Sequence, residues 1–304
     1  MPKERLHMLL ADESLRLLKG LNVCGRLNRE AYLLGAICPD MFFYDLPFFK
    51  LGIVGRGLHR FEGGAAVDFF TAWLQEEGRD MEQDAKNWML GFVGHLLADG
   101  LLHPFINDFC QRYSKELNLT ASDCHHWLES ELEAHWLVAI GPVGGYLPLL
   151  KRFAGRNGRI VKYLGCFRRF LMRAELPEIP SEAEIHRCLV WQTRLLRLFA
   201  DPRWTGMRPW LLQSRFSRSL GVLLVPQRTV LCLPKDHMEQ SRQGYSGKAT
   251  GNSSSKAAGT RSASEPDRME EPWLTAIRQI CQPNYMARVI SQLTNRLLEL
   301  PKHF

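Results

Sequence analysis

Apolar side chains recur at intervals of three and four residues along most of this chain, whereas sustained alternation with a period of two is nearly absent. Such intervals place apolar residues on one face of an α-helix, so the pattern predicts helices and not strands. Glycine and proline separate the predicted segments. The helices are expected over Leu6–Leu21, Ala66–Leu74, Asn87–His103, Ser122–Ile140, Ile160–Ala174 and Glu182–Phe199. We therefore expect an all-α fold, a multi-helix bundle.

The composition changes near residue 235. From there to Glu271 the chain is rich in Ser, Gly, Lys, Thr and Asn and poor in large apolar residues. Such a segment cannot bury enough surface to offset its ordering entropy, so we expect a flexible linker. Helical spacing returns over Pro272–Leu300, with a break at Pro283. The expected organisation is a helical domain over 1–235, a linker over 236–271 and a C-terminal helix over 272–304 that docks on the domain.

The composition is that of a globular protein, since apolar residues make up 45% and charged residues 23% of the 304 positions. Asp12 and Glu13 interrupt the leucines of the first segment, which reads as an amphipathic helix and not a secretory signal. The longest stretch without Lys, Arg, Asp or Glu, Ala134–Leu150, is too short and too rich in glycine and proline to span a membrane. We expect a cytoplasmic protein, with membrane association left open.

The eight cysteines are scattered and form no CxxC pair. In a chain without an export signal they are expected to be reduced and mostly buried, so a four-thiolate zinc cluster is not expected. Cys38 and Cys124 adjoin other candidate ligands, but we expect neither to bind a metal.

Positive charge is concentrated between Lys151 and Arg173, where eight basic residues occur without an acidic one and aromatic residues are interleaved. A stripe of this kind could contact anionic lipid headgroups or nucleic acid. It could equally be a solvated basic helix face.

Three ionisable residues, His95, Asp99 and His103, recur at intervals of four inside the apolar helix Asn87–His103. Four residues advance about 400° around a helix, so the three side chains stay on one face. Imidazole and carboxylate are ligands of zinc, and a buried Asp between two His would otherwise need a specific hydrogen-bond network. The helix therefore predicts a metal site.

Further candidate ligands lie on both sides of this helix. His7 is on the first predicted helix, Asp40 ends the motif Gly-Ala-Ile-Cys-Pro-Asp, and His59 follows an aromatic stretch, Phe42–Tyr44. Those aromatic residues could line a pocket or belong to the core. Downstream, Ser122 could cap a helix that places His125 four residues before Glu129, on one face.

In this order the residues resemble the zinc-dependent phospholipase C family, whose fold is shared with the S1/P1-type nucleases. The series that carries the resemblance covers about residues 1–150: His7, Gly35-x3-Pro39-Asp40, His59, His95-x3-Asp99-x3-His103-Pro104 and His125-x3-Glu129. Cys38 stands where the family commonly has Gly.

The resemblance implies a cluster of zinc ions. One would be held by Asp40, His59, His95 and Asp99, a second by His103, His125 and Glu129, and a third by His7 with Asp99 bridging. Secreted members of the family complete the third site with an N-terminal Trp, whereas this chain begins Met1-Pro2. We therefore expect two or three ions. His126 competes with His125, which the family spacing favours.

The resemblance also implies metal-assisted hydrolysis of a phosphodiester, with Asp40 as the general base that orients the attacking water. The leading expectation is a phospholipase C-like enzyme acting on phospholipid headgroups, with a transient anionic membrane contact through Lys151–Arg173. The alternatives are a nuclease or nucleotidase on the same scaffold, for which nucleic acid would be the substrate, and a metal-binding protein without turnover.

Overall fold

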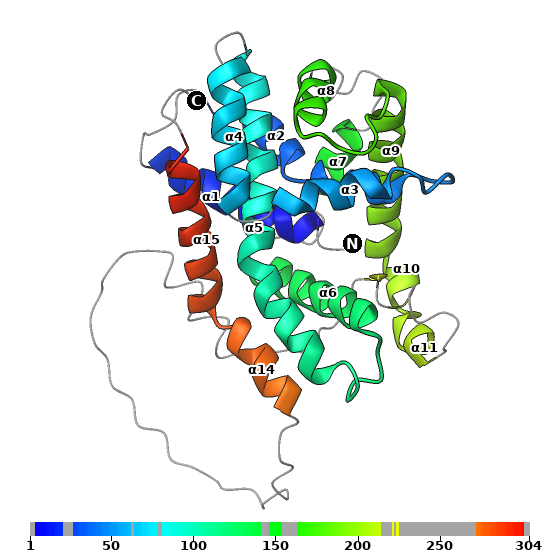
Figure 1. Cartoon of the computed structure of the whole chain (residues 1–304). Helices are drawn as coiled ribbons and strands as arrows, with labels where there is room; N and C mark the ends of the chain where they lie inside the picture. The colour runs from blue at the N-terminus through cyan, green and yellow to red at the C-terminus, as the bar shows by residue number, and fades with distance from the viewer. Residues whose placement is uncertain are drawn as a thin grey trace, which may run out of the picture.

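The computed structural model of the chain describes residues 4–20, 27–61, 64–77, 81–140, 146–153, 163–213, 221, 223–224 and 272–300. Helices and turns account for these residues and no strand occurs among them, which confirms the all-α prediction (Figure 1). The elements in chain order are α1 Glu4–Gly20, α2 Arg29–Gly35, η1 Pro39–Tyr44, α3 Gly52–Leu58, η2 His59–Phe61, α4 Gly64–Glu77, α5 Gln83–Tyr113, α6 Ala121–Ile140, α7 Leu147–Phe153, α8 Leu164–Arg173, α9 Glu182–Ala200, α10 Pro202–Thr205, α11 Arg208–Gln213, α14 Pro272–Ile280 and α15 Pro283–Leu298.

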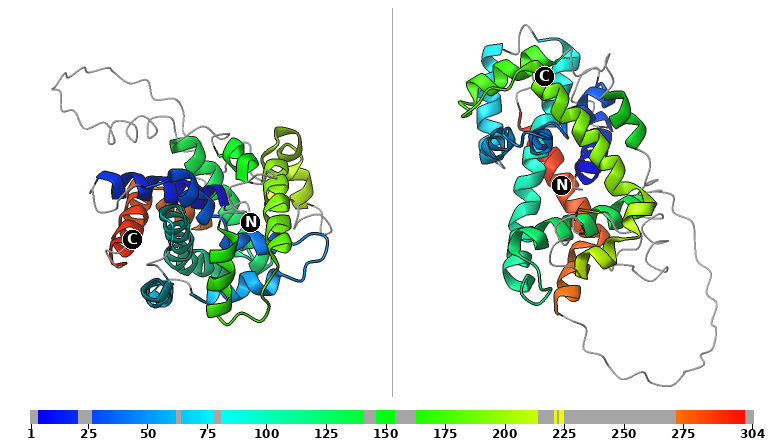
Figure 2. Two further views of the ribbon diagram at one scale, coloured as in Figure 1. Left: turned by 90° about the horizontal axis from the view of Figure 1, so that it is seen from above. Right: turned by 90° about the vertical axis from the view of Figure 1, so that its right-hand side faces the viewer.

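Helix α5 is the central element, and Figure 2 shows the other helices packed around it. It contacts α1, α2, α4, α6 and α15, and its apolar residues, among them Trp88 and Phe92, are fully buried. By length and composition α5 is the one helix in the described part of the chain that could cross a membrane, but 72% of its apolar window is buried inside the molecule. Burial of this kind is also what a core helix of a soluble protein shows.

The sequence predicts that this helix ends at His103, before a proline, but α5 continues through Pro104 to Tyr113. Proline removes one helical hydrogen bond and usually ends or kinks a helix. Here Ile106, Phe109 and Cys110 are buried on the far side of Pro104. Tertiary packing of that apolar face therefore outweighs the tendency of Pro104 to end the helix.

Helices α2 and α5 cross at very short distance because glycines face each other at the contact. A Cβ atom on Gly35 would lie 1.8 Å from the Trp88 carbonyl oxygen, and one on Gly91 would lie 1.9 Å from the Tyr32 carbonyl oxygen. Any side chain at either position would force the helices apart. This crossing brings the end of α2 against the middle of α5, where the candidate ligands His95 and Asp99 lie.

Helix α6 begins one residue earlier than predicted, and its cap is a different residue. The Thr120 hydroxyl accepts the backbone N–H of Asp123 at 3.0 Å and donates to the Asp123 carboxylate at 2.8 Å. Ser122 lies inside the helix, so its predicted role as the cap is wrong. A hydroxyl three residues before the bonded N–H is the usual N-cap arrangement, and Thr120 has this spacing.

The C-terminal segment forms two helices, and the break falls where proline predicted it: α14 ends at Ile280 and α15 begins at Pro283. Helix α15 packs against α1 and α5 with Met286, Val289 and Leu293 buried. It thus covers two of the helices that carry candidate ligands. The linker predicted over 236–271 lies outside the described residues.

Candidate metal centre

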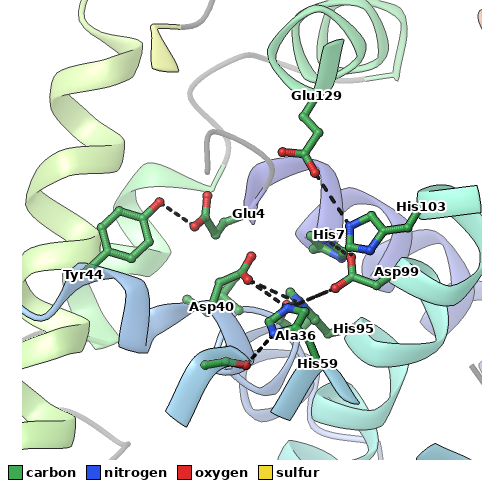
Figure 3. A network of polar contacts seen from close by, with 12 residues as sticks. Glu4, His7, Ala36, Asp40, Tyr44, His59, His95, Asp99, His103 and Glu129 are labelled. Carbon is green, nitrogen blue, oxygen red and sulfur yellow. Dashed lines mark hydrogen bonds and ion pairs between the residues drawn. The ribbon is translucent and has the colours of Figure 1, made fainter. Parts of the chain in front are cut away.

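All eight residues predicted as metal ligands converge on one region between α1, η1, η2, α5 and α6. Figure 3 labels all of them except His125. They come from segments spread over more than 120 residues of the chain, from His7 to Glu129. His7, Asp40, His95 and Asp99 are almost completely buried, and His59 and His103 are only slightly exposed. Burial of so many ionisable groups in one place requires partners that compensate their lost hydration.

Asp99 lies at the middle of this region, and its two carboxylate oxygens face different sets of imidazoles. Oδ2 is 3.1 Å from His59 Nε2 and 3.2 Å from His95 Nε2. Oδ1 is 3.1 Å from His7 Nε2 and 3.5 Å from His103 Nε2. A carboxylate in this position can bridge two metal ions.

Asp40, His59, His95 and Asp99 form a compact group of four donor atoms. His59 Nε2 is 3.2 Å from Asp40 Oδ1, and His95 Nε2 is 3.7 Å from the same oxygen. The two Nε2 atoms are 3.4 Å apart. Zinc bound tetrahedrally at about 2.0–2.1 Å would hold its donor atoms about 3.3 Å apart. The five distances given among these donors, 3.1–3.7 Å, lie near that spacing, so the four residues could hold one zinc ion.

Backbone carbonyls fix which nitrogen of His59 and His95 faces the group. His59 Nδ1 is 2.8 Å from the Gly55 carbonyl oxygen, and His95 Nδ1 is 2.8 Å from the Ala36 carbonyl oxygen. A carbonyl only accepts hydrogen bonds, so each Nδ1 carries a proton, and Nε2 is the atom of each ring that faces Asp99. Carboxylates and imidazole Nε2 atoms this close together need a proton or a metal cation between them. Outer hydrogen bonds of this kind are typical of metal-bound histidines.

A second group consists of His103, His125 and Glu129, at the other end of the region. Glu129 Oε1 is 2.9 Å from His125 Nε2 and 3.9 Å from His103 Nε2. His126, the competing candidate, lies on the other side of the carboxylate, where its Nδ1 is 3.6 Å from Oε2. The geometry places His125, and not His126, together with His103.

His7 joins the region from α1 and completes a third group with His95 and Asp99. Its ring is stacked on that of His95, with centroids 3.9 Å apart. Among the residues that the structure describes, His7 Nδ1 has no hydrogen-bond partner, so stacking and the contact with Asp99 orient the ring. This group has fewer donors than the first.

Residues 6–146 match the family model of zinc dependent phospholipase C, and this segment contains all eight of these residues. The matched segment belongs to the zinc-dependent phospholipase C family. No curated protein and no solved structure compared with this chain matches it significantly. The nitrogen and oxygen donors described above are ligand types that zinc takes, so the site in this segment fits the metal for which the matched family is named.

Two polar residues beside Asp40 were not identified from the sequence as part of the site. Glu4 is fully buried, and the Tyr44 hydroxyl donates a hydrogen bond to its Oε1 (Figure 3). Burial, and then the nearby charge of Asp40, raise the pKa of Glu4 to about 8. The two residues are forty positions apart and neither belongs to a local motif, so residue spacing does not predict the pair, although Tyr44 is predicted as a candidate pocket wall.

The three aromatic residues after Asp40 have different environments. Phe42 is fully buried and packs against Phe167, so it belongs to the core. Phe43 is partly buried, and its ring centroid lies 5.5 Å from that of His59. Phe43 therefore lies at the metal centre, together with Tyr44.

Several other ionisable residues lie outside the donor groups. Glu133 forms a buried ion pair with Arg5 that ties α6 to α1. The Cys38 thiol donates to the Leu34 carbonyl oxygen at 3.1 Å. His135 and His186 belong to none of the donor groups formed by described residues. Glu62, His237 and His303 lie outside the described residues.

Proposed function

We propose that this protein is a zinc-dependent phosphodiester hydrolase that acts as a phospholipase C and cleaves phospholipid headgroups. The observation that carries the proposal is the position of Asp99, whose two oxygens lie 3.1–3.5 Å from the Nε2 atoms of four histidines. A carboxylate whose two oxygens face different histidines is suited to hold adjacent metal ions. We propose that the site binds two or three zinc ions. Membership of the zinc-dependent phospholipase C family supports the same reaction class.

Bound zinc would supply a Lewis acid for the phosphoryl oxygens and a water molecule of lowered pKa. The residues of the chain have separate tasks. His59 and His95, each oriented by a backbone carbonyl, would hold the metal position next to Asp40. Asp40 would accept a proton from the attacking water, because its Oδ1 faces the Nε2 atoms of His59 and His95, which would bind the metal. Water would add to phosphorus, the bond to the diacylglycerol oxygen would break, and that oxygen would take up a proton.

Charge balance favours an anionic substrate. Two or three zinc ions would bring four to six positive charges, whereas Asp40, Asp99 and Glu129 bring at most three negative ones. A phosphodiester would reduce the excess. Lipids and nucleic acids both contain phosphodiesters, and the family assignment favours the lipid.

The proposal is tested by replacing the shared carboxylate, Asp99→Asn. We expect the variant to lose bound zinc and to hydrolyse phosphatidylcholine more than about 100-fold more slowly, a larger loss than removal of an outer hydrogen-bond partner causes. Zinc content by elemental analysis and headgroup release are the measurements. The matched control is Asp108→Asn, because Asp108 lies on the same helix but is exposed and forms a surface ion pair with Arg112. Full activity of Asp99→Asn would contradict the proposal.

The same preparation distinguishes the alternatives. Cleavage of single-stranded DNA that equals or exceeds hydrolysis of phosphatidylcholine would favour the nuclease. Absence of both activities with zinc fully bound would favour a metal-binding protein without turnover.

Membrane contact through Lys151–Arg173 and cytoplasmic location stay predictions. Several of the described basic residues in that stretch are already paired with acids: Arg152 with Glu30 at 3.0 Å, Arg169 with Glu77 at 3.0 Å and Arg173 with Glu76 at 2.7 Å. These ion pairs leave less positive charge for lipid headgroups than the sequence alone suggested.

A further inference from the structure

Large apolar side chains are exposed at two places on one side of the molecule. Phe48, Phe49 and Ile53 lie between η1 and the start of α3, with Phe49 70% exposed. Trp204, Met207 and Trp210 lie on α10 and α11, with Trp210 65% exposed. We call these six residues the aromatic rim. In Figures 1 and 2 both groups of elements lie on the side of α9, at the right of Figure 1.

The segment that carries Phe48 and Phe49 is held firmly in place. Asp45 Oδ2 accepts the backbone N–H groups of Lys50 and Leu51, both at 3.1 Å, and its Oδ1 receives Arg187 of α9 at 2.6 Å. Phe49 has a φ of 55°, a left-handed conformation that costs a residue with a bulky side chain free energy. The fold thus keeps two phenylalanines in water on a fixed and strained backbone, which points to an external partner.

Helices α10 and α11 are anchored as well. Arg208 of α11 forms a buried ion pair with Glu131 of α6 at 2.6 Å. Glu131 is two residues from Glu129, so the anchor attaches the second part of the rim to the helix that carries a predicted metal ligand.

An apolar cluster joins α11, which carries Trp210, to the candidate metal centre. Leu211 of α11 belongs to one cluster with Tyr44 and with Phe199 of α9, and Phe43 packs against this cluster. Phe43 is also the ring that contacts His59. The helix that carries Trp210 is therefore connected through apolar contacts to the ring beside His59.

Positive charge lies between the two parts of the rim. Arg194 on the outer side of α9 is exposed and its guanidinium lies 5.2 Å from the Trp191 ring centroid, and Arg197 follows one turn later. Neither arginine has an acidic partner among the residues that the structure describes. Aromatic rings beside unpaired arginines are characteristic of surfaces that lie in the headgroup layer of a membrane.

We propose that the aromatic rim docks the protein on a phospholipid bilayer that contains anionic lipid, with the metal centre behind the rim. The inference rests on the proposed function for its choice of partner, because an enzyme of this class must take its substrate from a membrane. Phe48, Phe49 and the two exposed tryptophans insert at the level of the headgroups, and Arg194 and Arg197 contact the anionic ones.

The test is binding of the full-length zinc-loaded protein to vesicles of phosphatidylcholine and phosphatidylserine, measured by cosedimentation. The double variant Phe49→Ser/Trp210→Ser removes one exposed ring from each part of the rim and is expected to bind about tenfold more weakly or worse. Met172→Ser is the matched control, because Met172 on α8 is also 62% exposed but lies outside the rim. Unchanged thermal unfolding of both variants shows that the fold is retained.

Hydrolysis of a short-chain phosphatidylcholine below its critical micelle concentration separates this inference from the proposed function. We expect the double variant to hydrolyse the dissolved lipid as the wild type does, while vesicle hydrolysis falls with vesicle binding.

If no form of the protein hydrolyses lipid but the double variant alone loses vesicle binding, the docking surface stands and the proposed function fails. Equal vesicle binding by the wild type and the double variant would overturn the docking surface, as would a loss of binding in Met172→Ser alone. A change of oligomeric state in the double variant, without a change in vesicle binding, would assign the rim to a second copy of the chain.

Discussion

His125 and His126 are neighbours in the sequence, but they face different oxygens of Glu129, and His125 alone is grouped with His103. Replacing His125 with Ala is therefore expected to remove one zinc ion per chain, whereas His126→Ala is expected to leave the zinc content unchanged. The two variants serve as controls for each other, because the residues are adjacent in α6 and of equal size. Elemental analysis of purified protein gives the result, and equal zinc loss from both variants would contradict this assignment.

His59 should exchange a proton for zinc. Burial lowers its pKa, but hydrogen bonds that His59 donates to Asp40 and Asp99, together with the charges of these carboxylates, outweigh burial and raise the pKa to about 10 in the metal-free protein. His59 is therefore protonated at about pH 8, and zinc must displace that proton, so zinc affinity should rise with pH until about pH 10. The same raised pKa stabilises the metal-free fold, and this contribution is lost as the pH rises from the unfolded value of 6.5 through about 10.

Calorimetric titration with zinc in buffers of different ionisation enthalpy measures this release directly. We expect about one proton from His59 at about pH 8, and less from a His59→Gln variant. Zinc binding that is independent of the buffer would argue against a protonated His59.

The sequence predicts eight metal ligands from residue type, spacing and order, and the structure brings all eight side chains together. It could not identify Glu4 as a neighbour of Asp40, because a buried carboxylate bonded to Tyr44 is defined by tertiary contacts across forty residues. For the same reason the ion pair of Glu133 with Arg5 was missed. Local spacing reveals ligands on one helix, whereas contacts between helices need the fold.

At the scale of elements, the crossing of α2 and α5 determines whether His95 meets the Ala36 carbonyl. Gly91→Ala would place a Cβ atom 1.9 Å from the Tyr32 carbonyl oxygen, so the two helices must separate. We expect the variant to lower the free energy of unfolding by about 2 kcal/mol or more and to weaken zinc binding, since the partner of His95 Nδ1 moves away. Urea unfolding and competitive zinc titration are the measurements.

Gly165→Ala is the control for this prediction. Gly165 is also helical, in α8, but its added Cβ would come no closer than 4.0 Å to the Arg169 side chain. Alanine is the better helix former by about 1 kcal/mol, so this variant should be as stable as the wild type or slightly more stable. If Gly91→Ala behaved in the same way, the close crossing would not position the site.

The long amphipathic helices could be predicted because their apolar periodicity extends over several turns, as in α1, α6 and α9. Short elements such as α2, α3 and α10 span too few residues to show a period, and their glycines and prolines read as loops. The sequence predicts that α5 ends at His103, because proline usually ends a helix. The helix continues to Tyr113 because Phe109 and Cys110 are buried beyond Pro104. Packing is the information that the sequence pattern lacks.

At the scale of the whole molecule, the candidate metal centre depends on the complete bundle. Its predicted donors come from five elements between α1 and α6, and α15, from the other end of the chain, packs on α1 and α5. An unfolded chain cannot hold these donors together, so zinc bound by them would contribute its free energy of binding to the stability of the fold.

The most direct test is X-ray diffraction on either side of the zinc absorption edge, from crystals of the full-length chain grown without added metal. The account predicts an anomalous peak among Asp40, His59, His95 and Asp99, and a second among His103, His125 and Glu129. Absence of anomalous density within bonding distance of Asp99, in protein that is folded, would contradict it.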